Sequence, residues 1–118
     1  MQKLRLTLIT ENQKSFEKAT RAAELICETL GWQKGYEISK YEKFESSYRI
    51  VIKEQVQNEE NSIARSIELT DRICSPWLVT FHREENNVSL IFNKSNYSRF
   101  LRNEFNVLKW AEFEIENE

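Results

Sequence analysis

KLRLTLITENQKSFEKATRAAELICETLGW, residues 3–32, changes its hydrophobic period once, and this change decides the fold. The leucines at positions 4, 6 and 8 alternate with polar residues, which is typical of a strand with one buried face. From Phe16 to Leu30 the apolar residues recur at helical spacing, and Gly31 supplies the left-handed residue that ends a helix. Because Thr10 and Gln13 have the spacing of a capping box, the stretch predicts a strand, an N-cap at Thr10 and a helix.

The residues that follow extend this order of elements. Residues 35–56 predict a hairpin, with a bulge near Ser39 where the parity of the apolar residues changes. A helical stripe that includes Ile63 and Ile67 comes next, and a further strand ends near residue 83. Together, about residues 3–83 predict the β-α-β-β-α-β unit of a ferredoxin-like α+β fold. In this fold the helices cover one face of the sheet, and the first and third strands are neighbours.

Beyond this unit the chain predicts three extensions. The last strand of the unit opens a second hairpin over 76–92, which turns at asparagines that tolerate positive φ. A third helix is predicted from Ser95, and its apolar face consists of Tyr97, Leu101, Phe105 and Leu108. Two alternatives stay open for about residues 109–116: a continued helix leaves Trp110 off the stripe, whereas a final strand matches the alternation of EFEIENE.

The composition predicts a single globular domain over residues 1–118. A hydrophobic fraction of 40% is too high for intrinsic disorder, and 31% of charged residues gives a well-solvated exterior. Two glycines in the whole chain are too few for a glycine-rich phosphate loop. The short apolar stretch at the start is broken by Arg5, so we expect no signal peptide, no membrane span and a cytoplasmic protein.

No residue set for catalysis, metal binding or cofactor binding stands out, and we therefore expect a protein that is not an enzyme. Cys27 and Cys74 lie on apolar helix faces, which is typical of buried free thiols, although a disulfide between them stays open. His82 is the only histidine, so it has no second imidazole for a metal site, and no serine lies in a Gly-x-Ser-x-Gly turn. The paired carboxylates fall in segments predicted to be solvated turns, where their pKa values would stay ordinary.

Strand parity places basic side chains on the sheet face that the helices leave open. Those residues are Arg5, Arg49, Lys53 and His82. Arg5 would lie beside Arg49 or Lys53, and like charges on neighbouring strands call for a negative group to offset them. Nucleic acid could supply that group, and a basic open sheet has the geometry of an RNA-recognition domain. The third strand, SYRIVIKEQ, lacks the glycine-aromatic motif of that domain, which makes nucleic-acid binding the alternative function here.

Charge is distributed unevenly along the chain. Residues 1–53 carry ten Lys and Arg against seven Asp and Glu, a net charge of +3, whereas residues 54–118 carry seven against twelve, a net charge of −5. Near the end, Glu112, Glu114 and Glu116 occupy alternate positions beside Trp110. This pattern is typical of a solvated strand, and it also fits an acidic strip that attracts a basic partner.

In size, acidic balance and the dense mixture of aromatic and charged residues, the chain resembles bacterial immunity proteins that neutralise a cognate toxin. The resemblance implies a cytoplasmic protein that binds a toxin domain tightly, without chemistry of its own. A basic toxin domain would gain association rate and specificity from an acidic partner. The expected contacts are Glu84, Glu85, Asn86 and Asn87 at the second hairpin, and Trp110, Glu112, Glu114 and Glu116 near the C-terminus.

Overall fold

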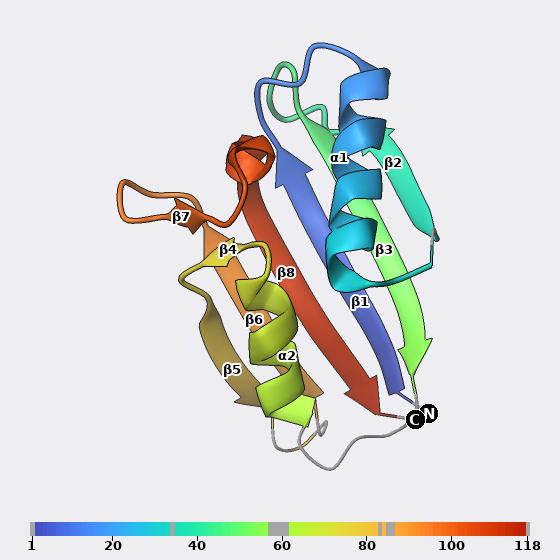
Figure 1. Cartoon of the computed structure of the whole chain (residues 1–118), viewed down its shortest axis with the longest axis vertical. Helices are drawn as coiled ribbons and strands as arrows, with labels where there is room; N and C mark the ends of the chain where they lie inside the picture. Colours follow the sequence, from blue (N-terminus) through green and yellow to red (C-terminus); the bar gives the residue numbers. More distant parts are fainter. Residues whose placement is uncertain (1, 34, 57–61, 83, 85–86, 118) are drawn as a thin grey trace.

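Six strands pair antiparallel into one sheet in the computed structural model, which describes residues 2–33, 35–56, 62–82, 84 and 87–117 (Figure 1). In chain order the elements are β1 (Gln2–Thr10), α1 (Phe16–Leu30), β2 (Tyr36–Lys40), β3 (Tyr48–Val56), α2 (Ser62–Asp71), β4 (Cys74–Ser75), β5 (Leu78–His82), β6 (Asn87–Asn93), β7 (Arg99–Phe100), the 3₁₀ helix η1 (Asn103–Val107) and β8 (Leu108–Asn117). The large sheet has the order β2-β3-β1-β8-β6-β5, and β4 and β7 form a separate two-stranded sheet.

This strand order confirms the α+β class but not the ferredoxin-like topology. The first and third strands are neighbours, as predicted, and Arg5 lies opposite Lys53 in the register between them. The other side of β1 is occupied by β8, the last strand, whereas a ferredoxin-like order would place the strand that follows α2 there. The strand that follows α2 and β4 is β5, which lies at the far edge of the sheet.

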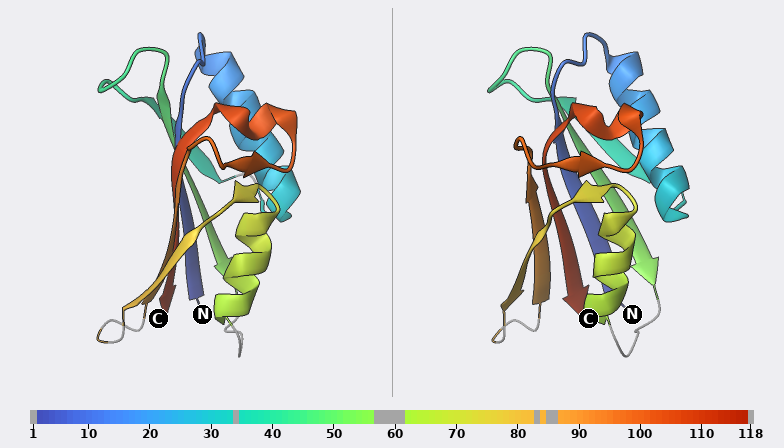
Figure 2. Two further views of the ribbon diagram at one scale, coloured as in Figure 1. Left: turned by 90° about the vertical axis from the view of Figure 1, so that its left-hand side faces the viewer. Right: turned by 60° about the vertical axis from the view of Figure 1, so that its left-hand side comes forward.

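The two helices lie on one side of the sheet. α1 packs against β2 and β3, α2 packs against β8, and the second small sheet and η1 lie on the same side (Figure 2). Between these layers lies the hydrophobic core, whose largest fully buried side chains are Phe92, Phe105, Phe113, Leu6, Leu8, Ile26, Ile50, Ile52, Leu69, Ile73, Leu90 and Leu108. The alternation of β1 follows from this arrangement, because its leucines face the helices and its intervening residues face the other way.

The predicted body and C-terminal end of α1 are confirmed, but its N-cap is not at Thr10. The side chain of Ser15 accepts a hydrogen bond from the backbone N–H of Lys18, and Gly31 ends the helix with φ of 72°. β1 includes Thr10, whose hydroxyl oxygen accepts a hydrogen bond from the backbone N–H of Tyr48 at 3.1 Å. The strand pairing of the residues around Thr10 therefore takes precedence over a local capping box.

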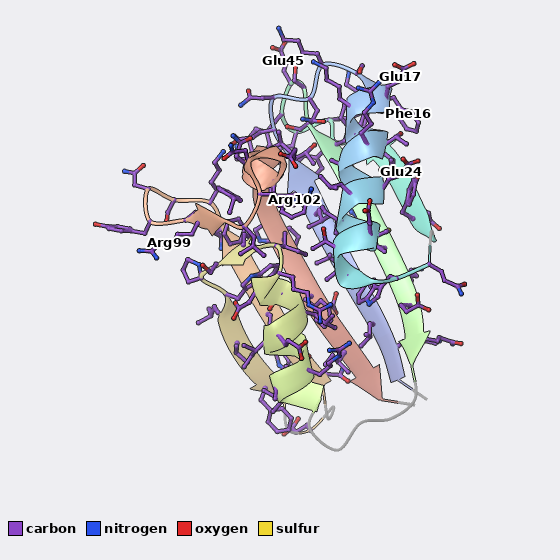
Figure 3. All side chains as sticks on the ribbon, viewed as in Figure 1. Phe16, Glu17, Glu24, Glu45, Arg99 and Arg102 are labelled. Atoms are coloured by element: carbon purple, nitrogen blue, oxygen red, sulfur yellow. The ribbon has the colours of Figure 1, made fainter. Side chains whose placement is uncertain are left out.

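The tyrosine that opens β2 ties this strand to α1. The hydroxyl of Tyr36 donates a hydrogen bond to a carboxylate oxygen of Glu24 at 3.1 Å, and Figure 3 labels Glu24 on α1. β2 pairs with β3 in an unbroken register, so the bulge predicted near Ser39 is absent from these strands. The parity changes at Tyr41 because β2 has ended there, and residues 41–47 form the connecting loop.

Both predicted free thiols are confirmed, while the apolar stripe of α2 is confirmed only in part. Cys27 and Cys74 are both buried, and they form no disulfide with each other. In α2, however, Ile63 and Ile67 are exposed, and the helix buries Leu69 instead. The later members of the predicted stripe, Thr70, Ile73 and Cys74, are buried, so the prediction is wrong only for the first turns of the helix.

The third helix predicted from Ser95 does not form. Its predicted apolar face divides into an exposed and a buried part: Tyr97 and Leu101 are 86% and 67% exposed, whereas Phe105 and Leu108 are buried. Residues 99–100 pair with β4, and only the short η1 follows before the chain enters β8. A helix with this stripe would have buried all four side chains on one face. The final strand, which was one of two alternatives, is confirmed as β8.

Candidate functional site

The sheet face opposite the helices has no helix packed on it in the part of the chain that the structure describes (Figure 2). The odd-numbered residues of β1 face this side, because the leucines between them face the core. On the neighbouring strands the same face carries Arg49, Val51 and Lys53 of β3 and Trp110, Glu112 and Glu114 of β8. We call this surface the open face.

A pocket of about 570 Å³ occupies one end of the open face. Its floor comes from β1 and β8, and its lining from these strands consists of Arg5, Thr7, Ile9, Lys109, Trp110, Glu112 and Glu114. Arg49 of β3 and Asn93 and Lys94 at the end of β6 contribute from the sides. A volume of this size falls within the range of ordinary ligand pockets, about 300–1,000 Å³.

The loop 41–47 forms one wall of the pocket and projects from the sheet on the side away from the helices (Figure 2). The backbone N–H of Tyr41 donates to the carbonyl oxygen of Ser47 at 2.9 Å, which closes the base of the loop. The rings of Tyr41 and Phe44 pack with their centroids 5.9 Å apart. The ammonium of Lys109 lies 3.6 Å from the centroid of Phe44, so a cation–π contact joins the loop to the start of β8.

The C-terminal strand supplies the negative group that offsets the charge of Arg5. Nη2 and Nε of Arg5 both donate to Oε1 of Glu114, at 2.6 and 3.2 Å. On its other side Arg5 faces Lys53 across β1 and β3, where two like charges would otherwise repel. The basic and acidic strips predicted from the sequence are therefore adjacent, and they partly neutralise each other.

Glu112 lies next to this ion pair on the same face of β8. Partial burial raises the pKa of the Glu112 carboxyl above its ordinary value of 4.5, and the charge of Glu114 and a hydrogen bond with it raise the pKa further. The positive charges of Arg5 and His82 act in the opposite direction and are the smaller effects. Glu112 therefore holds its proton more tightly than a solvated glutamate does.

The remaining charges leave the pocket with an excess of cations near the loop. Lys94 is occupied, because its ammonium contacts a carboxylate oxygen of Glu11 at 2.5 Å and the carbonyl oxygen of Asn106 at 2.6 Å. Arg49 is exposed and has no ion pair or hydrogen bond with its side chain among the described residues. The ammonium of Lys109 contacts the ring of Phe44 and forms no ion pair or side-chain hydrogen bond within the same described part. An anion in the pocket could therefore approach Arg49 and Lys109.

The structure brings together only part of each predicted residue set. Of the predicted nucleic-acid contacts, Arg5 and Arg49 line the pocket. Lys53 lines a second hollow of about 470 Å³ that shares Arg5 with the first, and His82 lies on β5 at the edge of the sheet. The basic surface is therefore not continuous across the sheet.

Of the predicted protein contacts, some line the pocket and others lie at the far end of the sheet. Trp110 is half-buried and lines the pocket together with Glu112 and Glu114. Glu84 and Asn87 lie at the turn between β5 and β6, and the backbone of Glu116 lies toward the far end of β8. Glu85 and Asn86 lie outside the described residues.

Sequence reasoning missed the two aromatic side chains of the loop and the lysine beside Trp110. Tyr41 and Phe44 belong to no periodic pattern, because they lie in a turn between strands. The parity change at Tyr41 was the available signal, and it marked the end of a strand rather than a bulge. Lys109 had no local signal, since its contact with Phe44 depends on the tertiary fold.

No cluster of three or more His, Cys, Asp or Glu that could hold a metal ion occurs among the described residues. Within the same residues, no helix has both the length and the apolar character needed to cross a bilayer. Comparisons with protein-family models, curated proteins and solved structures found no match.

Proposed function

We propose that this protein is a non-enzymatic protein-binding module that docks a partner on its open face, and that it acts as an immunity protein against a bacterial toxin. The observation that carries the proposal is the pocket at one end of an uncovered sheet face, with the half-buried Trp110 in its lining. Tryptophan, tyrosine and arginine are the residues most often found at the energetic centres of protein interfaces. Trp110, Tyr41 and Arg49 all line this pocket.

The chemistry of the pocket supports binding over catalysis. Its described lining contains no serine, cysteine or histidine, which are the usual nucleophiles and bases of covalent catalysis. Both cysteines are buried on the other side of the sheet, among the core residues. Of the two lining carboxyls, Glu114 is already engaged by Arg5. A partner side chain inserted between the loop 41–47 and β8 would be enclosed by aromatic rings and oriented by the surrounding charges.

A specific observation also supports a second candidate, the binding of single-stranded nucleic acid. Two neighbouring hollows share Arg5, and between them they present Lys3, Lys53, Arg49 and Lys109. Basic side chains that follow a groove beside aromatic rings are typical of proteins that bind single strands through phosphates and stacking. The acidic pI of the whole chain, about 5.6, weakens this candidate relative to a protein partner.

Co-expression tests the first proposal directly. The probe is the product of a neighbouring gene that arrests growth of the host when it is expressed alone. We expect the wild-type protein to restore growth and to co-purify with this product, and we expect Trp110→Ala to lose both effects. Tyr97→Ala is the matched control, because Tyr97 is an aromatic residue that is 86% exposed and does not line the pocket. Equal protection by the two variants would rule out this face as the docking surface.

A fluorescence-anisotropy titration separates the second candidate from the first. The probe is a labelled single-stranded RNA or DNA of mixed sequence at low salt. Binding that weakens in Arg49→Ala and Lys53→Ala, and that falls steeply with added salt, would support nucleic acid as the ligand. No measurable binding at low salt would remove this candidate and would leave the protein-binding proposal unaffected.

A further inference from the structure

We infer that the pocket is a binding site for an aromatic anion, a planar ring that carries a carboxylate or a phosphate group. The inference rests on the proposed function, because it names the chemistry of the group that a partner would insert. It applies equally to a free molecule of that kind, so it can be tested with small probes.

Three neighbouring strands, β3, β1 and β8, place an arginine and a tryptophan on either side of an isoleucine in the pocket. In the register of the sheet, Ile9 pairs with Arg49 on one side and with Trp110 on the other. Arg49 and Trp110 therefore flank a buried apolar residue and lie two strand spacings apart, roughly 10 Å. A ring that packs on Trp110 and Ile9 can direct its charged substituent toward Arg49.

The loop 41–47 adds aromatic surface to the pocket, and it also contacts a second cation, Lys109. Tyr41 and Phe44 face the pocket from the loop, and Lys109 lies over Phe44. A ligand ring would thus have Trp110 in the floor and two further rings in the wall. Aromatic rings prefer offset or edge-to-face contacts with one another, and such contacts stabilise a bound ring beyond the burial of its area.

The charges that line the pocket favour an anion at its loop end. The two cations nearest the loop, Arg49 and Lys109, have no carboxylate partner among the described residues, whereas Arg5 and Lys94 have one each. The acidic side chains lie farther along β8, where Glu114 is held by Arg5. An anion is therefore attracted at the loop end of the pocket, and the two lining carboxyls, Glu112 and Glu114, lie at its other end.

Nuclear magnetic resonance of the tryptophan indole groups tests this site with defined probes. The chain has three tryptophans, and Trp32 and Trp77 pack on core phenylalanines on the helix side, so they serve as internal references. Phenyl phosphate and benzoate each combine the ring with one of the two anionic groups. Benzyl alcohol carries the ring alone, and inorganic phosphate carries the anion alone.

We expect the Trp110 indole signal to shift saturably with phenyl phosphate or benzoate, at a dissociation constant of about 1 mM, which is typical of ligands with so few atoms. The tighter of the two probes identifies whether phosphate or carboxylate is the preferred group. Benzyl alcohol and inorganic phosphate should bind at least tenfold more weakly. No shift of Trp110 with either aromatic anion at 20-fold this concentration, or equal binding of benzyl alcohol, would overturn the inference.

A matched pair of arginine variants locates the anion. Arg49→Gln should weaken binding of the aromatic anion about tenfold or more, whereas Arg99→Gln should leave it unchanged. Arg99 is exposed on β7, which lies on the helix side of the sheet and is labelled in Figure 3. Both arginines are exposed, so both variants are expected to fold, and an unchanged unfolding midpoint checks this. Equal weakening by the two variants would also overturn the site.

The probe experiment and the co-expression experiment fail independently. If the probes bind but the protein rescues no growth, the anion site stands and the immunity proposal falls. If Trp110→Ala abolishes rescue but no aromatic anion binds, the docking surface stands and the proposed chemistry of the inserted group is wrong.

Discussion

Arg5 and Glu114 lie 109 residues apart in the sequence and form an ion pair on the open face, with Nη2 and Nε of the arginine both directed at one carboxylate oxygen. The pair joins β1 to β8, the two strands at the centre of the sheet. It also offsets the unfavourable approach of Arg5 and Lys53 on β1 and β3. The acidic C-terminal strand thus has a role within the fold in addition to any role toward a partner.

A double-mutant cycle measures the energy of this pair. We expect Arg5→Met and Glu114→Gln each to lower the free energy of unfolding, with a coupling energy of about 1 kcal/mol that decreases at high salt. Urea unfolding of the four proteins gives the values. Arg65 and Glu68 on α2 form an exposed pair at 3.0 Å and serve as the control, which should show the smaller coupling because Glu68 is exposed and is shared with Arg72. A coupling for Arg5 and Glu114 no larger than this would contradict the structural role.

The raised pKa of Glu112 predicts that the stability of the fold falls as the pH rises from acidic to neutral values. Folding raises the pKa of its carboxyl above 4.5, so the folded chain binds this proton more tightly than the unfolded chain does. Its contribution to stability is therefore present at and below about pH 4.5 and is lost as the pH rises through the folded pKa. Glu112→Gln, which resembles the protonated form, should be more stable than the wild type at neutral pH, and the difference should shrink toward pH 4.

Chemical unfolding of the wild type and Glu112→Gln across pH 4–8 checks this sign. His82 is another group whose charge acts on Glu112, so the comparison is repeated in a His82→Gln background. Glu37→Gln, an exposed carboxylate on the edge strand β2, provides the control and should show no such trend. If Glu112→Gln instead gains stability relative to the wild type as the pH falls, folding lowers the pKa of Glu112 and the prediction is wrong.

Two residues of the predicted third helix distinguish the observed fold from that prediction. Phe105 is fully buried in η1, whereas Leu101 is 67% exposed. We expect Phe105→Ala to cost about 3–5 kcal/mol and Leu101→Ala to stay within about 0.5 kcal/mol. Urea denaturation curves of both variants provide the comparison. Similar costs for the two would favour a helix that buries both side chains.

The two thiols should be inert in the folded protein. Burial raises the pKa of the Cys74 thiol to about 12, and Cys27 is equally buried, so little reactive thiolate is accessible at pH 8. We expect a thiol reagent such as iodoacetamide to label neither cysteine in the native protein and both in denaturant. Asn96→Cys, at an exposed position between β6 and β7, is the positive control. Absence of labelling in denaturant without a reductant would indicate a disulfide.

Local periodicity predicted the elements that depend on local contacts. β1, the body of α1, the two hairpins and β8 all follow from alternation or helical spacing in neighbouring residues. The segment from Ser95 to Leu108 was misread because Tyr97 and Leu101 match a helical stripe by spacing alone. There the pairing of β7 with β4 and the contact of Phe100 with Phe92 determine the structure, and both involve residues outside this segment.

The candidate site shows the same limit. Arg5 and Arg49 were predicted as one surface and Trp110 with Glu112 as another, although all four line the same pocket. What unites them is the pairing of β1 with β8, which no local pattern encodes. The aromatic wall of the pocket escaped prediction for a related reason, since loop side chains carry no period.

The position of β8 has a consequence for the order in which the protein can fold during synthesis. This strand leaves the ribosome last of the eight described strands, yet it lies between β1 and β6 and joins β2-β3-β1 to β6-β5. Until it emerges, β1 and β6 lack the strand that lies between them in the complete sheet, and each leaves an edge that another chain could extend. Completion of the sheet must then await translation of the final ten-residue strand, after which the two halves close around it.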